Sequence, residues 1–363
     1  MDLPVIASSD RVYLRPVAFV DSPINMDDAA VRLAGGLLWF SAYELIVVRD
    51  GRRIVQRAIP AGNLPSDERL RAIAARVTGP RPPLSLGERI LRFDQPQVMG
   101  ILNMTPDSFS DGGQHLDNPA AAVAAGVDMG VQGAALIDAG GESTRPGAKE
   151  VWEGDEIARV IPAIEGLARS GTLVSVDTRK AGVMEAALNA GAHIVNDVSA
   201  LLWDDRALEV VVRAQCPVVL MHAGDPRQGA DGGRGYGDAL IEVYDWLEAR
   251  IDAVVAAGVD RSRIIADPGI GFGKSLADNL ALLNGLAMFH GLGVPLLLGA
   301  SRKRIVGALS NEAPAEQRLG GSIALALKGA DAGVQLLRVH DVPETVQALR
   351  VWRGLRDAAL TGR

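Results

Sequence analysis

Polar side chains follow each of eight short apolar runs in the second part of the 363-residue chain. The runs span residues 98–102, 135–137, 173–176, 193–195, 218–221, 264–266, 295–298 and 335–339. The residues at or just after their ends are Asn103, Asp138, Asp177, Asn196, Asp197, His222, Asp267, Ser301, Arg302, Lys303, Arg338 and His340. A ring of polar groups this dense indicates one binding site.

One part of this set can accept hydrogen bonds from a flat heterocycle. Asp177 and Asp267 can pair with the adjacent ring N–H and exocyclic amine of an aminopyrimidinone through two parallel charge-assisted bonds. Asn196 offers both a donor and an acceptor. Such a site rejects rings without those groups, because its own polar atoms would be left unpaired.

The other part of the set can bind an anion and its metal. Arg338 and His340 alternate along the last run, so both can face one side, and arginine binds phosphate oxygens bidentately. Asn103 is a hard oxygen ligand suited to Mg²⁺, which takes few protein ligands beside phosphate oxygens. These residues predict a diphosphate site with Mg²⁺.

The elements that carry these residues are expected to be parallel strands. The eight runs are continuously apolar, as in strands buried on both faces, and amphipathic segments separate them. Leu240, Val243, Leu247, Ile251 and Val254 form one helical face. This alternation predicts an α/β fold, a (β/α)₈ TIM barrel with its site at the carboxyl ends of the strands. An open doubly wound sheet is the alternative, but Gly-x-Gly-x-x-Gly is missing after the first run.

The first 85 residues follow another pattern. Strands are expected at 11–17, 43–49 and 52–58, the last two joined by a type I′ turn at Asp50-Gly51. A helix over 66–77 would be capped by Ser66. The proline-rich stretch 79–83 indicates a linker. We therefore predict a small N-terminal α+β extension, residues 1–85, of unknown role, and a barrel over residues 86–363.

Composition narrows the function. The net charge is −7 without a basic run, which argues against nucleic acid as a partner. One cysteine, Cys216, excludes an intrachain disulfide. The absence of a signal-like or membrane-spanning apolar segment predicts no membrane association and a cytoplasmic location.

Several long motifs give the chain a family resemblance. The run from Met99 to Gly113 resembles the first loop of dihydropteroate synthases, and residues 140–148 resemble their second loop. The segments 176–178, 195–197, 267–274, 301–303 and 338–341 follow in the family's order. The resemblance covers residues 90–345, about three quarters of the chain.

The resemblance implies an activity and a set of site residues. The enzyme would condense 6-hydroxymethyl-7,8-dihydropterin diphosphate with 4-aminobenzoate, giving 7,8-dihydropteroate and diphosphate in folate biosynthesis. Catalytic roles would fall to Lys303, Arg338, His340 and Asp177, and the Mg²⁺ contact to Asn103. The pterin diphosphate would contact Thr144, Asp177, Asn196, Met221, Asp267, Lys303, Arg338 and His340. The 4-aminobenzoate pocket would be lined by Phe109, Pro146, Phe272, Ser301 and Arg302.

The resemblance also implies a dissociative reaction, in which diphosphate leaves before the amine adds, while the residues alone leave direct displacement open. The Gly- and Ser-rich first two loops are expected to close over the substrate. Sulfonamides should compete with 4-aminobenzoate. A homodimer is favoured, with Leu349, Trp352 and Leu355 of a last helix over 342–360 as candidate contacts.

Some residues have more modest alternatives. Asp138 and Glu142 could only brace the second loop, Asp197 could cap the next helix, and Lys274 could be solvated. The glycine-rich segment 223–237 departs from the family pattern. Two other functions stay open: a pterin-binding methyltransferase, which does not need Arg338 with His340, and a catalytically dead binding protein.

Overall fold

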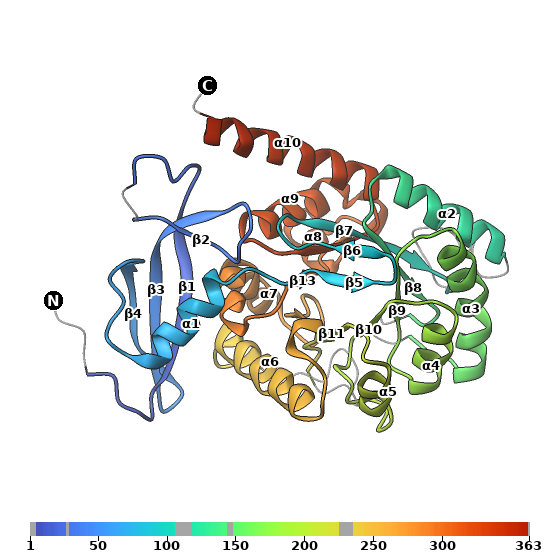
Figure 1. Ribbon diagram of the computed structural model, residues 1–363, viewed down its shortest axis with the longest axis horizontal. Helices are drawn as coiled ribbons and strands as arrows, with labels where there is room; N and C mark the ends of the chain where they lie inside the picture. Colours follow the sequence, from blue (N-terminus) through green and yellow to red (C-terminus); the bar gives the residue numbers. More distant parts are fainter. Residues whose placement is uncertain (1–4, 27–28, 106–117, 144–147, 225–234, 362–363) are drawn as a thin grey trace.

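The computed structural model describes residues 5–26, 29–105, 118–143, 148–224 and 235–361 (Figure 1). Eight parallel strands form one sheet in the order β12-β11-β10-β9-β8-β7-β14-β13, and a parallel bridge between Ala266 and Leu296 links its two ends into a barrel. The strands are β7 (Gln97–Asn103), β8 (Leu136–Gly140), β9 (Val174–Asp177), β10 (Ile194–Asp197), β11 (Val218–Met221), β12 (Ile264–Asp267), β13 (Leu297–Leu298) and β14 (Leu336–Val339). The predicted (β/α)₈ barrel is confirmed.

Helices alternate with these strands along the chain. Asn118 caps the first of them by accepting a hydrogen bond from Ala121 N at 3.0 Å, and Pro119 takes the first helical position, as its fixed φ favours. The helices are α2 (Pro119–Gln132), α3 (Glu153–Arg169), α4 (Ala181–Asn189), α5 (Ala207–Ala214), α6 (Ala239–Ala256), α7 (Leu276–Gly285), the 3₁₀ helix η2 (Leu286–Leu292), α8 (Arg304–Leu309), α9 (Leu319–Asp331) and α10 (Val342–Thr361). None among the described residues has the length and apolar character needed to cross a membrane.

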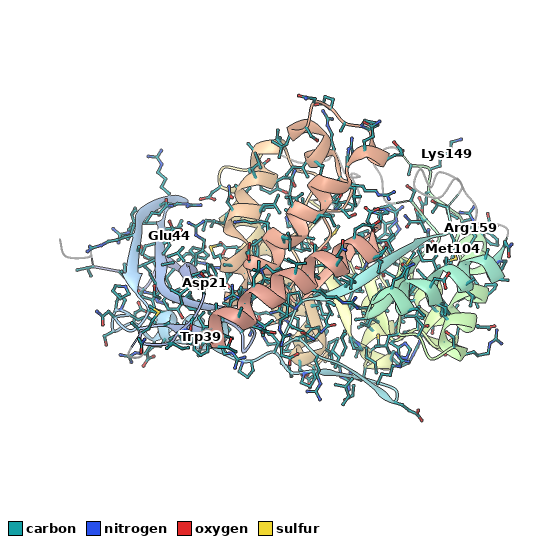
Figure 2. All side chains as sticks on the ribbon, turned by 90° about the horizontal axis from the view of Figure 1, so that it is seen from above. Asp21, Trp39, Glu44, Met104, Lys149 and Arg159 are labelled. Atoms are coloured by element: carbon teal, nitrogen blue, oxygen red, sulfur yellow. The ribbon has the colours of Figure 1, made fainter. Side chains whose placement is uncertain are left out.

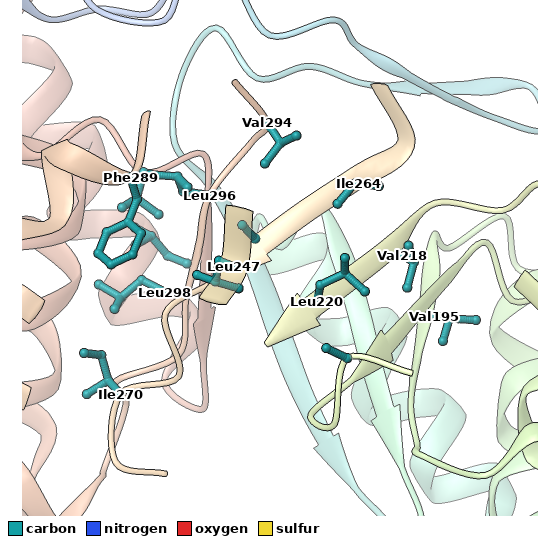
Figure 3. Packing of buried hydrophobic residues seen from close by; sticks show 14 of the residues in the cluster. Val195, Val218, Leu220, Leu247, Ile264, Ile270, Phe289, Val294, Leu296 and Leu298 are labelled. Atoms are coloured by element: carbon teal, nitrogen blue, oxygen red, sulfur yellow. The ribbon is translucent and has the colours of Figure 1, made fainter. Parts of the chain in front are cut away.

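Apolar packing on both sides explains why the strands read as continuous runs. Outward-facing residues such as Leu220 and Ile264 join one core with Leu247 of α6 (Figure 3). A hairpin of β5 (Leu84–Leu86) and β6 (Arg89–Leu91) packs against the residues near the amino ends of the strands, including Met99, Leu136 and Leu336. The hairpin therefore covers that end of the barrel and leaves the carboxyl ends for the site.

The N-terminal extension forms a four-stranded antiparallel sheet with its own core. Its central strand β3 (Trp39–Arg49) pairs with β1 (Arg11–Val20), β2 (Val31–Arg32) and β4 (Arg52–Pro60), and helix α1 (Glu68–Thr78) packs against β1. Asp50 and Gly51 have φ values of 48° and 73°, as the predicted type I′ turn requires. Buried Leu14, Phe40, Leu45 and Leu70 belong to this core.

Several details of the extension differ from the prediction. The strand expected over 11–17 continues to Val20 because it stays paired with β3. Asp67, not Ser66, caps α1 by accepting a hydrogen bond from Arg69 N at 2.8 Å. Asp67 also pairs with the Arg69 side chain, whereas Ser66 Oγ accepts from Arg71. The second partner favours the aspartate as the cap.

The linker is irregular, as predicted, but it is fastened to the barrel. Buried Arg81 donates to the carbonyl oxygens of Arg76 and Gly79 at 2.8 and 3.0 Å, and to that of His290 in η2 at 3.0 Å. Figure 2 labels Trp39 and Glu44 of the extension at one end of the molecule, and Met104, which follows β7, at the other. The extension therefore lies far from the start of the first loop.

Candidate active site

The carboxyl ends of the strands bring the predicted residues together. Asn103, Asp177 and Asp267 are the last residues of β7, β9 and β12. Strand register aligns Asn103 with Gly140, and Gly140 with Asp177. It also aligns Asn196 with Asp177, and Met221 with Asp267. Residues far apart in sequence thus meet at one mouth, as the barrel predicts.

Arg338 of β14 reaches across this mouth to two carboxylates. Its Nε lies 2.6 Å from Asp138 Oδ2, and its Nη2 lies 2.7 Å from Asp177 Oδ2. Asn196 donates its amide to the same Asp138 oxygen at 3.0 Å. Asp138 is fully buried and belongs to this cluster. It therefore does more than brace the second loop, which was the modest alternative from the sequence. Its position among the strand-end carboxylates was the signal in the sequence.

Burial sets the ionisation of the cluster. It raises the pKa of Asp177 to about 7, with Arg338 opposing and Asp138 reinforcing the shift. Burial also raises the pKa of Asp267. Burial by itself would lower the pKa of Arg338, but the two carboxylates outweigh it and hold that pKa above its usual value. The guanidinium is therefore the fixed charge of the mouth, and it opposes the effect of burial on the pKa of Asp177.

Lys303 forms a second cationic point at the mouth. Its Nζ donates to Ile270 O and lies 4.3 Å from the centroid of the Phe272 ring. Burial lowers the pKa of Lys303 to about 8, against the influence of nearby Asp267. The structure thus brings together three predicted residues: Phe272, Lys303 and Asp267.

The segment after β13 meets the end of β14. Ser301 Oγ accepts from His340 N at 3.2 Å and lies 3.1 Å from His340 Nδ1. Arg302 forms a two-point ion pair with Asp341, in which Nε lies 3.1 Å from Oδ2. Ser301, Arg302 and His340 therefore share one edge of the mouth. The predicted site residues Phe109, Thr144 and Pro146, with most of the first two loops, lie outside the described residues.

Lys274 is not solvated, which corrects one alternative from the sequence. Its Nζ donates to the carbonyl oxygens of His222, Gly269 and Phe272 at 2.9, 2.9 and 3.0 Å. Burial lowers its pKa to about 7. Gly269 approaches so closely that an added Cβ would lie 1.9 Å from His222 O. Lys274 thus fastens the loop after β12 to the end of β11.

Two acidic residues support neighbouring turns. Glu142, at the start of the second loop, pairs with Lys180 and with Arg179, the latter at 2.7 Å. This agrees with a bracing role. Asp197 accepts from the backbone N–H groups of Ser199 and Leu201 at 2.7 and 2.8 Å. It therefore fixes the turn after β10, and the idea that it caps the next helix is wrong, because α5 begins only at Ala207.

His222 gives this region a pH dependence. Burial, assisted by Lys274, lowers its pKa from 6.5 to about 3, so the folded protein keeps it neutral while the unfolded chain binds a proton. Its contribution to stability is complete above pH 6.5 and is lost as pH falls toward 3. In His222→Gln that dependence is absent. We expect the unfolding free energy of wild type, relative to this variant, to fall by about 1.4 kcal/mol per pH unit over this range.

Urea unfolding at pH 7.5, 5.5 and 4.5 measures this difference. The value at pH 7.5 is the internal control, because both forms are neutral at this position there. Parallel stability profiles for the two proteins would contradict a buried neutral His222.

Comparisons with known proteins agree with this site. Residues 99–340 match the pterin binding enzyme family. The dihydropteroate synthase of Escherichia coli K12 is 45% identical over 263 residues, which are 72% of this chain and 92% of that protein. A Xanthomonas albilineans dihydropteroate synthase structure with 4-aminobenzoic acid has a TM-score of 0.71 and 49% identity, covering 76% of this chain and 98% of the other.

A Yersinia pestis dihydropteroate synthase structure with a sulfonamide drug has a TM-score of 0.72 and 44% identity, covering 76% of this chain and 100% of the other. Residues before 99 lie outside the family match, and so the N-terminal extension does too. These relatives support the predicted transferase of folate biosynthesis over a methyltransferase. The chain belongs to the pterin-binding enzymes and, within them, to the dihydropteroate synthases.

Proposed function

We propose that this chain joins 4-aminobenzoate to 6-hydroxymethyl-7,8-dihydropterin diphosphate at the mouth of the barrel, with the residue roles given below. The observation that carries these roles is the buried ion pairing of Arg338 with Asp138 and Asp177. It supplies both a carboxylate site for the ring and a guanidinium for the diphosphate.

The pterin ring would bind to Asp177, Asn196 and Asp267, over Met221. Asp177 Oδ1 and Asp138 Oδ1 are buried without a hydrogen-bond partner among the described residues. Buried acceptors of this kind require an explanation, and a ring N–H with an exocyclic amine supplies the missing donors. Lys303 is the cation suited to a ring carbonyl oxygen, and Thr144 would complete the substrate contacts.

Arg338 would change partners when the substrate enters. A guanidinium presents parallel N–H donors, as the aminopyrimidinone edge of a pterin does. The ring can therefore take over the Asp177 oxygen that now lies 2.7 Å from Arg338 Nη2. The released guanidinium would then bind the diphosphate together with His340, which is close to Ser301.

The residues present fit a Mg²⁺ ion bound mainly by the substrate. Asn103 offers one amide oxygen at the end of β7, and the described residues contain no group of three or more His, Cys, Asp or Glu that could form a protein-built metal cage. Mg²⁺ commonly takes one or two protein ligands beside phosphate oxygens and water. Bound there, it would neutralise charge on the leaving diphosphate.

In the dissociative order that the family resemblance implies, the same residues would act in both steps. Arg338 and His340 stabilise the departing diphosphate, and the carboxylates of Asp177 and Asp267 stabilise the positive charge left on the pterin methylene. The amine of 4-aminobenzoate would then add to the methylene carbon and lose one N–H proton, to the released diphosphate or to solvent. Phe272, Ser301 and Arg302, with Phe109 and Pro146, would line its pocket, which a sulfonamide would also occupy.

The activity is tested by mixing the protein with both substrates and Mg²⁺ and following diphosphate and 7,8-dihydropteroate. We expect equimolar products, a loss of turnover in excess EDTA, and recovery when Mg²⁺ is restored. No diphosphate release with both substrates present would sink the proposal and leave the dead binding protein as the alternative. Unchanged turnover in EDTA would contradict the proposed role of Mg²⁺.

Arg338→Ala separates the leaving-group role from the fold. We expect kcat/KM for the pterin diphosphate to fall by about 10² to 10³ or more, because a charge-stabilising donor is lost from a buried site. Exposed Arg304, next to Lys303, provides the matched control Arg304→Ala. Circular dichroism verifies folding of both variants. Wild-type kcat/KM in a folded Arg338→Ala would refute the diphosphate assignment.

The predicted homodimer belongs to the same proposal. On α10, Val351 and Leu355 are 60% and 71% exposed, which supports them as contacts between copies. Trp352 packs on the core of the extension and Leu349 on that of the barrel, so these two predicted contacts have intramolecular roles. Light scattering after size exclusion should give a dimer mass that Leu355→Glu reduces. A monomeric wild type would contradict this proposal.

A further inference from the structure

The N-terminal extension, which lies outside the family match, is tied by charge to helix α6 of the barrel. Arg11 and the Tyr13 hydroxyl of β1 both contact Asp245, at 2.5 and 2.9 Å. Arg76 of α1 lies 3.3 Å from Glu248. The contacts are spread along α6, whose first residue follows the connection from β11. The extension is therefore tied to the helix that follows β11 in the chain.

Arg53 makes the contact at the start of that helix. Its Nε lies 2.6 Å from Asp238 Oδ2, and its Nη2 lies 2.8 Å from Asp238 Oδ1, so both carboxylate oxygens are held. The pairing of β3 with β4 shifts from Val47–Val55 to Val48–Arg53, which leaves Ile54 as an extra residue. A bulge of this kind re-aims the neighbouring side chain. The position of Arg53 is thus built into the hairpin.

Asp238 is the cap of α6, and Arg53 completes its fixation. The carboxylate accepts from Ile241 N at 3.4 Å, a long bond for a helix cap. The Asp238 N–H donates to Glu242 Oε1 at 2.8 Å. Because the capping bond is long, the two short bonds from Arg53 are the stronger restraint on this carboxylate.

The chain on both sides of Asp238 touches the end of β11. The ring of Trp246 in α6 lies edge-on to His222, with centroids 4.8 Å apart, and the ring of Tyr236 lies 6.0 Å from His222. His222 follows Met221, and its carbonyl oxygen accepts from Lys274. A shift of Asp238 would therefore move two of the rings around His222.

We propose that Arg53 is a positioning residue for the pterin side of the active site. It holds Asp238, and through it keeps Tyr236 and Trp246 against His222, beside Met221. Arg53 itself touches no substrate. The inference rests on the proposed function, because Met221 is assigned to the pterin there. It gives the extension a role in the reaction of the barrel.

The test compares Arg53→Ala with Arg52→Ala, which removes the same charge from an exposed neighbour on β4. Arg53→Lys keeps the charge but not the two-point bond. We expect Arg53→Ala to raise KM for the pterin diphosphate about threefold to tenfold, the size expected for a partly buried charge-assisted pair. The KM for 4-aminobenzoate and kcat should stay within about twofold of the wild-type values. For Arg53→Lys, the KM for the pterin diphosphate should lie between those of wild type and Arg53→Ala.

Hydrogen exchange on the substrate-free proteins supplies a second readout. Arg53→Ala should speed exchange at the amides of Ile241 and Glu242, and Arg52→Ala should leave it unchanged. Equal KM and exchange for the two alanine variants would overturn the proposal. The proposal would also be overturned if kcat fell, both KM values rose by the same factor and the melting temperature dropped, because that pattern indicates a merely structural role. Absent turnover in wild type would count against the proposed function only, since exchange still tests the link.

Discussion

One guanidinium between two buried carboxylates is the constraint on which the site depends. Asp138, Asp177 and Asp267 are all buried at one barrel mouth, and burial raises the pKa of Asp177 and of Asp267. Arg338 offsets this by pairing with two of them. In the proposed mechanism its departure toward the diphosphate leaves the Asp177 charge facing the ring where positive charge develops. Binding of the leaving group and stabilisation of the cation are then coupled.

The barrel makes this arrangement possible because its strands are rigid and share one open end. The β5–β6 hairpin fills the opposite end with apolar side chains and leaves the carboxyl ends for the polar groups of the site. Further fixation comes from Lys274, which joins the loop after β12 to β11. On the outside, α6 links this site to the extension through the Arg53–Asp238 pair. The extension is thus joined to the barrel by specific charge pairs as well as by packing.

Sequence patterns predicted the strands of the barrel and the end at which the site residues lie, because both follow from the order of residues along the chain. Parallel strands buried on both faces leave continuous apolar runs, and the residues after them fall at one mouth by topology. The partners within that mouth could not be predicted: Arg338 and Asp138 are 200 residues apart, and nothing in their spacing indicates a contact. The idea that Lys274 is solvated was wrong for a related reason. Its partners are backbone carbonyl oxygens, which every residue has, so no residue type in the sequence marks them. Similarly, the Arg53–Asp238 pair joins two units whose docking no local pattern records.

The most direct test of the account is a crystal structure with the pterin diphosphate bound and 4-aminobenzoate absent. The account predicts that the pterin edge occupies Asp177, and that the Arg338 guanidinium has left it for the diphosphate oxygens. If Arg338 still lies about 2.7 Å from Asp177 in that complex, with the ring bound elsewhere, the exchange is contradicted.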